Sequence, residues 1–288
     1  MVESPAGSGF EGWRVSVPHV PEFVLDAGAQ PNACYKENNT VPDIEPWTTQ
    51  VFVMMLNQAP QFLDIGANVG WYSLIASSVT GGHAHVHAFE PEPTNFKTLQ
   101  ENIQRNEFSN ITAWPIALGD SDVKMELFLS EENMGDHRLS PIYGRRSVEV
   151  DVFRLDTVMR NIEFVPDIVK IDVQGAEVLV LDGAREVFRR AGDKLAIIIE
   201  FAPECLGMNN ARTLVERLAE FGRPMFDLYP YDGGMLRPLS KDALLKSLDG
   251  CLNPKFDSHI DILVAPNDDR FENIRQLIGA DFWEWHVD

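Results

Sequence analysis

The chain has 288 residues, of which 44% are hydrophobic and 24% are charged, and this composition is typical of a soluble globular protein with a sizeable core. It carries 24 Lys and Arg against 44 Asp and Glu, so its formal net charge is −20. Because a strongly acidic protein repels nucleic-acid phosphates and anionic lipid surfaces, we expect neither nucleic acid nor a membrane as its partner.

Cysteine usage and the first residues indicate a compartment. Cys34, Cys205 and Cys251 lie far apart, without the C-x-x-C spacing of a zinc site or an even disulfide framework. The opening Met-Val-Glu-Ser-Pro lacks the basic and apolar regions of a signal peptide. No apolar run approaches the roughly 20 residues of a membrane helix. We therefore predict a cytoplasmic protein.

Hydrophobic periodicity predicts the elements in chain order. Residues 1–43 are rich in Pro, Gly, Asn and Glu, and we expect an irregular N-terminal arm with one or two short strands before a single domain over 44–288. A helix at about 44–57 comes first, and strand and helix patterns then alternate. The strands are predicted at 62–65, 83–89, 111–117, 168–173, 195–200, 225–229 and 259–265; the helices are predicted at 71–78, 94–106, 157–160 with Asp156 as N-cap, 177–190, 211–221, 241–248 and 271–278. This alternation predicts an α/β fold with a mostly parallel sheet covered on both faces.

Two further segments alternate with a period of two. One face of 123–129 carries a valine, a methionine and two leucines, and one face of 147–153 carries three valines. This pattern predicts an antiparallel strand pair beside the main sheet. The segment between them, 130–146, is polar and without periodicity. Long loops of this kind inside compact domains tend to be lids or binding loops.

The predicted parallel strands end in polar and mostly acidic residues. Asp64, Gly66, Asn68 and Gly70 follow or close the first strand, Glu90 the second, Gly119 and Asp120 the third, Asp172 and Gln174 the fourth, and Glu200 the fifth. In open parallel sheets, ligands bind outside these carboxyl ends. Structural requirements alone would not place a carboxylate at successive strand ends, so this pattern is the main functional signal.

The glycine turn after the first strand narrows the choice of ligand. A dinucleotide fingerprint is G-x-G-x-x-G, whereas here Gly66 and Gly70 are separated by three residues and Asn68 stands where the second glycine would be. Glu90 could accept hydrogen bonds from both ribose hydroxyls, or it could be the N-cap of the following helix. A nucleoside without a pyrophosphate, carrying a sulfonium and an amino-acid tail, suits this turn, and S-adenosylmethionine is that ligand.

Several motifs together resemble the FkbM-type S-adenosylmethionine-dependent methyltransferases. They are Phe-Leu-Asp-Ile-Gly-Ala-Asn-Val-Gly-Trp-Tyr-Ser (62–73), Ala-Phe-Glu-Pro-Glu-Pro (88–93), Ala-Leu-Gly-Asp (117–120), Asp-Ile-Val-Lys-Ile-Asp-Val-Gln-Gly-Ala-Glu (167–177) and the strand-end Glu200. The resemblance covers about residues 45–205. It implies the Rossmann-like, doubly wound class I methyltransferase fold with a mostly parallel seven-stranded sheet. It also implies O-methylation of a hydroxyl on a sugar or on a polyketide- or peptide-type small molecule. Gln174 stands where many members carry Glu.

The resemblance also implies site residues. The cofactor-binding set is Asp64, Gly66, Ala67, Asn68, Gly70, Trp71, Tyr72, Glu90, Pro91, Ala117, Leu118 and Asp172, with Glu90 on the ribose and Ala117–Leu118 beside the adenine. Candidates for the base that removes the acceptor's proton are Asp172, Glu200 and His137, since a loop histidine titrates near neutral pH. Alternatively, Asp172 only orients the cofactor, Glu200 pairs with Lys170, and His137 is a solvated loop residue. We expect no metal, because the acidic residues show no metal-binding spacing.

Three other classes of function compete with this hypothesis. An NAD(P)-dependent oxidoreductase would need the missing second glycine. A nucleic-acid base methyltransferase would carry Asn/Asp-Pro-Pro-aromatic where this chain has Asp-Val-Gln-Gly (172–175). A non-catalytic protein would bind the cofactor without turnover. We expect the acceptor to be chosen by the arm, by the 130–146 loop and by the C-terminal third; the arm and the residues after about 205 lie outside the resemblance.

Overall fold

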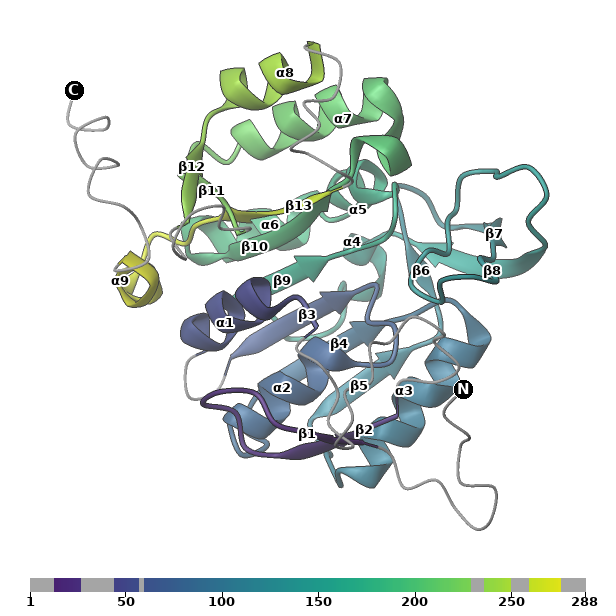
Figure 1. Cartoon of the computed structure of the whole chain (residues 1–288), viewed down its shortest axis with the longest axis vertical. Coiled ribbons are helices and arrows are strands. Elements are labelled where there is room, and N and C mark those ends of the chain that lie inside the picture. The colour runs from purple at the N-terminus through teal and green to yellow at the C-terminus, as the bar shows by residue number, and fades with distance from the viewer. Residues whose placement is uncertain (1–12, 27–43, 57–59, 229–235, 250–258, 276–288) are drawn as a thin grey trace.

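The computed structural model describes residues 13–26, 44–56, 60–228, 236–249 and 259–275. At its centre lies one large sheet (Figure 1). Its strands are, in spatial order, β12 (Arg237–Leu239), β11 (Met225–Asp227), β13 (Ile260–Val264), β10 (Ala196–Phe201), β9 (Ile168–Ile171), β3 (Gln61–Ile65), β4 (His85–Phe89) and β5 (Ile111–Trp114).

The five strands from β10 to β5 run parallel, and β13 is antiparallel to both of its neighbours, β10 and β11. The sheet is therefore mostly parallel and doubly wound, as predicted. The described part has eight strands rather than the predicted seven, because β12 pairs with β11 at the edge.

Successive residues of β3 supply two separate hydrophobic cores. Phe62 packs on one face and Leu63 on the other, and both are fully buried. The side-chain period of two explains why a central parallel strand reads as continuously apolar. One face is covered by α1 (Pro46–Met55), α2 (Trp71–Val79), α3 (Pro93–Arg105) and α9 (Asp269–Arg275), and the other by α4 (Leu155–Val158), α5 (Glu177–Gly183), α6 (Arg185–Ala191), α7 (Pro203–Ala219) and α8 (Lys241–Asp249).

The described part of the N-terminal segment is a β-hairpin, which agrees with the one or two strands expected in the arm. Strands β1 (Trp13–Val15) and β2 (Phe23–Leu25) pair in antiparallel register. The side chain of Asn102 on α3 both donates to and accepts from the backbone of Asp26. The hairpin is thus attached to the helix that follows β4. Residues 1–12 and 27–43 lie outside the described residues.

A small second sheet lies at the end of the main sheet toward which the parallel arrows point (Figure 1). Its order is β6 (Ala117–Leu118), β8 (Ser147–Phe153) and β7 (Val123–Phe128), with β7 and β8 antiparallel. The predicted strand over 111–117 was wrong at its end: β5 stops at Trp114, and Ala117 pairs with Val152 of the small sheet instead.

Three helix predictions also need correction. Asp156 is not an N-cap, because α4 begins one residue earlier; its carboxylate accepts instead from the backbone N–H groups of Glu186 and Val187 at the start of α6. The helix predicted over 177–190 is divided at Ala184 into α5 and α6. The helix predicted over 211–221 starts earlier, as α7, and contains a kink at Gly207. The predicted residues 229 and 276–278 lie outside the described part.

Candidate active site

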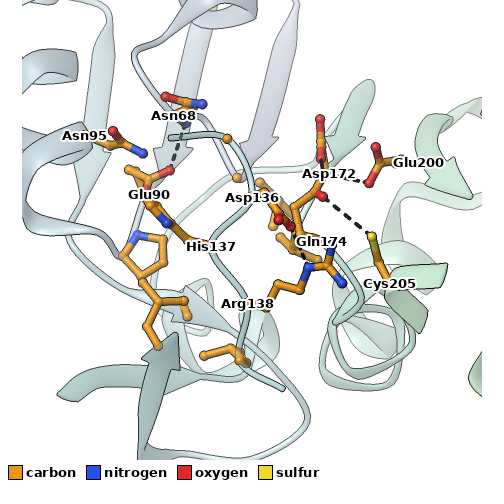
Figure 2. Close-up of a pocket in the computed structure, with 18 of the residues that line it drawn as sticks. Asn68, Glu90, Asn95, Asp136, His137, Arg138, Asp172, Gln174, Glu200 and Cys205 are labelled. Carbon is orange, nitrogen blue, oxygen red and sulfur yellow. Dashed lines mark hydrogen bonds and ion pairs between the residues drawn. The ribbon is translucent and has the colours of Figure 1, made fainter. Parts of the chain in front are cut away.

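A cavity of about 470 Å³ opens at the carboxyl ends of β3, β4, β9 and β10, beneath the loop that joins β7 to β8. This volume is in the range of small-molecule sites. Figure 2 shows the polar side chains that line this central cavity, among them Asn68, Glu90, Asn95, Asp136, His137, Arg138, Asp172, Gln174 and Glu200. The strand-end carboxylates predicted from the sequence are therefore brought together, except for Asp64 and Asp120.

The turn after β3 is held against the turn after β9. Gly66 has φ +83°, and a Cβ built there would lie 1.8 Å from the carbonyl oxygen of Asp172, so only glycine fits. Gly66 and Asn68 line the cavity, and Asn68 has a left-handed φ of 50°. Gly70 faces away from the cavity, because a Cβ there would meet the Leu99 side chain at 2.6 Å.

Asp64 lies behind the cavity, where it fixes the start of α2. Its buried Oδ2 accepts from the Ser73 hydroxyl at 2.6 Å and from the Ser73 backbone N–H at 3.1 Å. Burial raises the pKa of Asp64 to about 6, although the two hydrogen bonds oppose this shift. Asp64 therefore stabilises the start of α2 and does not line the cavity. Ala67 does not line the cavity either.

Trp71 and Tyr72, both predicted to bind the cofactor, point into the layer between α1 and α2. The indole N–H of Trp71 donates to Thr49 Oγ1 at 2.9 Å, and the Tyr72 hydroxyl donates to Glu45 Oε2 at 2.6 Å. Neither aromatic ring lines the cavity, whereas Glu45 does. Tyr72 thus reaches the site through Glu45, a residue that the sequence analysis missed, and through Lys170, whose Nζ lies 4.9 Å from the centre of the Tyr72 ring.

Glu90 is buried at the cavity wall and is held by two backbone donors. Its Oε2 accepts from the Asn68 N–H at 2.9 Å and its Oε1 from the Glu92 N–H at 2.8 Å. Burial raises its pKa to about 8 in spite of these bonds. Each oxygen keeps a second lone pair. The N-cap of α3 is Glu92, which accepts from the Asn95 N–H at 2.7 Å, so the alternative role considered for Glu90 belongs to its neighbour.

The wall next to Glu90 is apolar. It includes Pro91, Ile116, Ala117 and Leu118. Three of these were predicted: Pro91 follows Glu90 directly, and Ala117 and Leu118 form β6 of the small sheet. A carboxylate beside a flat apolar wall can hold the polar and the aromatic halves of a nucleoside.

Lys170 carries a positive charge beneath the acidic end of the cavity. Its side chain is only 3% exposed, and Nζ lies 2.9 Å from Asp172 Oδ2 and 3.5 Å from Glu45 Oε2. Burial alone would raise the pKa of Asp172, but the charge and hydrogen bond of Lys170 hold that pKa below its usual value. The predicted alternative pairing of Lys170 with Glu200 is replaced by these two contacts.

Gln174 joins the two carboxylates that were predicted as bases. Its amide nitrogen lies 2.8 Å from Asp172 Oδ1 and 2.8 Å from Glu200 Oε2. Burial raises the pKa of Glu200 well above its usual value, and the nearby Asp172 charge raises it further. The site therefore holds two carboxyl groups whose pKa values are shifted in opposite directions, with one amide between them.

His137 presents a hydrogen-bond donor rather than an acceptor. Its Nδ1 accepts from the Ser130 backbone N–H at 3.0 Å, and burial lowers its pKa. The neutral ring must then carry its proton on Nε2. That nitrogen is buried and has no hydrogen-bond partner among the described residues. The interpretation of His137 as a base does not fit this geometry.

The 130–146 segment forms a wall of the cavity, in line with its interpretation as a binding loop. Asn95 on α3 donates to the Met134 carbonyl at 2.9 Å, and Asp136 is bound by the guanidinium groups of both Arg138 and Arg145. Asn95 and Arg138 are lining residues that sequence reasoning missed, since neither belongs to a family motif.

Within the described ranges, no group of three or more His, Cys, Asp or Glu side chains is arranged to hold a metal ion. No helix in the same ranges is both long enough and apolar enough to cross a membrane.

Fold and site together have the features of a methyltransferase, and comparison with known proteins agrees. Residues 64–212 match the family model described as the methyltransferase FkbM domain. Because this match covers more than half of the chain, the protein belongs to the FkbM methyltransferase family.

Curated relatives and solved structures give more distant likenesses. "Methyltransferase 1" of Beauveria bassiana is 25% identical over 195 residues, which cover 60% of this chain and 74% of that protein. "Hexuronic acid methyltransferase AglP" of Haloferax volcanii is 31% identical over 121 residues, covering 42% of this chain and about half (48%) of AglP. The crystal structure of an FkbM methyltransferase from Methylobacillus flagellatus KT superposes with a TM-score of 0.46 and 18% identity, over 72% of this chain and 44% of that one.

Proposed function

We propose that this protein transfers a methyl group from S-adenosylmethionine to a hydroxyl of a small molecule. The central cavity supports this proposal, because the apolar wall beside Glu90 and the carboxyl groups of Asp172 and Glu200 line the same space. The name of AglP, a hexuronic acid methyltransferase, supports a sugar-type acceptor. A polyketide- or peptide-type acceptor remains within the same proposal.

The lining fits the cofactor at several points. Glu90 offers acceptor lone pairs for the two ribose hydroxyls, the orphaned Nε2–H of His137 offers a donor, and Pro91 and Leu118 offer an apolar wall for a purine. Because Gly66 has no side chain, the turn after β3 packs closely against the backbone of Asp172, and the backbone of this turn can lie along a ligand in the cavity. Bound S-adenosylmethionine supplies an electrophilic methyl group on a sulfonium, and a predominantly acidic lining suits that cation.

Glu200 is the candidate we favour as the base. Both oxygens of Asp172 are occupied, by Lys170 and Gln174, and its pKa is low. Glu200 keeps one oxygen, Oε1, without a hydrogen-bond partner in the described part of the chain. A base is most effective when its pKa lies near the working pH, which the raised pKa of Glu200 allows. As the new O–CH₃ bond forms and the C–S bond breaks, the hydroxyl proton passes to Glu200, while Asp172 and Lys170 hold the surrounding charge fixed.

The test is transfer of a tritiated methyl group from S-adenosylmethionine to a panel of hydroxylated acceptors, with cofactor binding measured separately by calorimetry. An ether product resists alkali, whereas a methyl ester does not. Glu200→Gln should bind the cofactor but lose transfer. Asp172→Asn should also lose transfer, and full activity in this variant would remove Asp172 from the mechanism. Glu126→Gln, on the exposed face of β7, is the matched control.

Two rivals predict other outcomes of the same experiments. An oxidoreductase would bind NADH in a fluorescence titration and would transfer no methyl group. A non-catalytic protein would bind S-adenosylmethionine and methylate none of the panel.

A further inference from the structure

Arg138 lines the central cavity, and the two terminal nitrogens of its guanidinium group are available to bind a ligand. The backbone of Arg138 is fixed by reciprocal hydrogen bonds with Phe128 of β7, at 2.8 and 3.0 Å. Its Nε donates to Asp136 Oδ1 at 2.5 Å, and its side chain is 20% exposed. Neither terminal nitrogen has a hydrogen-bond partner among the residues described here. In Figure 2 this end of the side chain lies near Gln174 and Cys205.

The charged side chains in direct contact with one another around Arg138 do not cancel. Asp136 is bound by Arg138 and by Arg145, so that two guanidinium groups share one carboxylate. Burial opposes ionisation of Asp136, but the arginine hydrogen bonds lower its pKa, and it stays charged. The group of three therefore carries a net charge of +1. It attracts a single negative charge to the outer side of Arg138.

The geometry and charge of the Arg138 guanidinium favour a carboxylate over a phosphate as the group that it binds. A guanidinium with its Nε side anchored still offers two parallel N–H donors, which match the two oxygens of a carboxylate. A dianionic phosphate would bring a second negative charge close to the ionised Asp172 and to Glu204, both of which line the same cavity. One carboxylate balances the +1 of Asp136, Arg138 and Arg145 taken together, whereas a dianionic phosphate exceeds it.

We propose that Arg138 binds a carboxylate of the methyl acceptor, so that the acceptor is a hydroxylated acid, such as a sugar acid, that is methylated on a hydroxyl. This inference rests on the proposed function and adds the substrate class. The acceptor's carboxylate would lie at Arg138 while the reacting hydroxyl reaches Glu200. Gln174 occupies the space between these two positions, since it donates to Glu200 and its carbonyl side faces Cys205.

Matched acceptor pairs test the inference. The full chain is assayed for methyl transfer with D-glucuronate against D-glucose, D-galacturonate against D-galactose, and 3-hydroxybenzoate against 3-hydroxybenzamide, with glucose 6-phosphate as the dianionic probe. Binding of the same probes is measured by calorimetry in the presence of S-adenosylhomocysteine. A bidentate charged hydrogen bond predicts a preference of about 10- to 100-fold in kcat/KM for the carboxylate member of a pair.

Variants assign that preference to Arg138. Arg138→Met should lower kcat/KM by about 10- to 100-fold for the acidic acceptor, mainly through KM, and should leave the neutral acceptor and the cofactor Kd unchanged. Arg138→Lys should keep part of the preference, because lysine retains the positive charge but lacks the two parallel N–H donors of the guanidinium group. Arg146→Met, at an exposed neighbouring position, is the control.

Each remaining outcome overturns the inference. Equal kcat/KM values for acidic and neutral acceptors would overturn it. An equal loss of kcat/KM for both kinds of acceptor in Arg138→Met would also overturn it, because it would mean that Arg138 has a structural role in the loop. A preference for glucose 6-phosphate over the carboxylate acceptors would overturn the inference too, as would a protein that binds the cofactor but none of the acidic probes. The proposed function fails separately, if the unaltered protein binds no S-adenosylmethionine and methylates nothing.

Discussion

The side-chain amide of Gln174 donates a hydrogen bond of 2.8 Å to Glu200. The same nitrogen lies 2.8 Å from Asp172, so the two carboxyl groups are linked through one neutral donor. Gln174 has a left-handed φ of 52°, and Gly175 after it has φ +105°. This tight turn directs the amide back between the two strand ends. A neutral donor at this point lets two acidic groups lie close together without a third negative charge.

Replacing that donor by an acid should move the pH dependence of the reaction. Gln174→Glu adds a carboxyl group beside Glu200, and the repulsion raises the pKa of Glu200 further. We expect the rising limb of the kcat/KM profile to move to higher pH by about one unit, and activity at pH 7 to fall by about tenfold. Gln104→Glu makes the same change at an exposed position of α3 and should leave the profile unchanged. An unshifted profile in Gln174→Glu would argue against Glu200 as the base.

Cofactor affinity should depend on pH through Glu90. Ribose hydroxyls donate hydrogen bonds to the ionised form, whereas the pKa of this buried carboxyl without ligand is about 8. Binding therefore releases a proton, and the affinity for S-adenosylmethionine should rise between pH 6 and pH 8, by at most about tenfold per unit. Glu90→Gln should weaken binding by about 10- to 100-fold and abolish this pH dependence. Calorimetry in buffers of different ionisation enthalpy measures both quantities, with Glu126→Gln as the control.

Stability without ligand should fall as the pH rises. Burial raises the pKa of Glu45 to about 7, of Glu90 to about 8 and of Glu177 to about 7. A carboxyl whose pKa is higher in the folded state holds its proton more tightly there, so its contribution is complete below about pH 4.5 and is lost as the pH passes the folded pKa. Each group costs at most about 1.4 kcal/mol per pH unit. Urea unfolding at pH 5.5, 7 and 8.5 should show this decrease, and a rise in stability over the same range would contradict it.

The gathering of Glu90, Asp172 and Glu200 could be predicted from the sequence, because parallel strands end at the same edge of a sheet. Their positions in the motif order were sufficient for that step. The number of strands and the end of β5 at Trp114 could not be predicted in the same way, because the pairing of short edge strands such as β12 depends on their neighbours. Periodicity alone does not assign a strand to one of two sheets.

Other features of the site depend on packing that no local pattern encodes. Asp64 and Asp172 both belong to strand ends, but the side chain of Asp64 points toward α2 and that of Asp172 toward the cavity. Glu45 and Arg138 come from a helix start and a loop whose approach is decided by distant contacts. The acceptor side of His137 is occupied by the backbone of Ser130, which a sequence does not reveal.

The contact between the turns after β3 and β9 should make Gly66 intolerant of any side chain. Gly66 and Gly144 have the same φ of +83°, but a Cβ at Gly66 would lie 1.8 Å from a backbone oxygen, and one at Gly144 would meet nothing within 4 Å. Gly144→Ala should therefore cost only the conformational strain, about 1 kcal/mol. Gly66→Ala should cost at least about 3 kcal/mol or prevent folding, because backbone atoms must shift. Equal losses in the two variants, measured by thermal unfolding, would mean that the close approach is relaxed in solution.

The position of Asp64 predicts a loss of stability rather than of cofactor affinity. Asp64→Ala removes the acceptor for both donors of Ser73 at the buried start of α2, so the unfolding free energy should fall by about 2–4 kcal/mol. Ser73→Ala should cost less, because the backbone N–H keeps its acceptor. Calorimetry below the melting temperature should give a cofactor Kd in Asp64→Ala within about threefold of the unaltered protein, in contrast to the larger change expected for Glu90→Gln. If Asp64 touched the cofactor directly, as the family motif implies, affinity would fall by about tenfold or more at unchanged stability, since a charged hydrogen bond to the ligand would be lost.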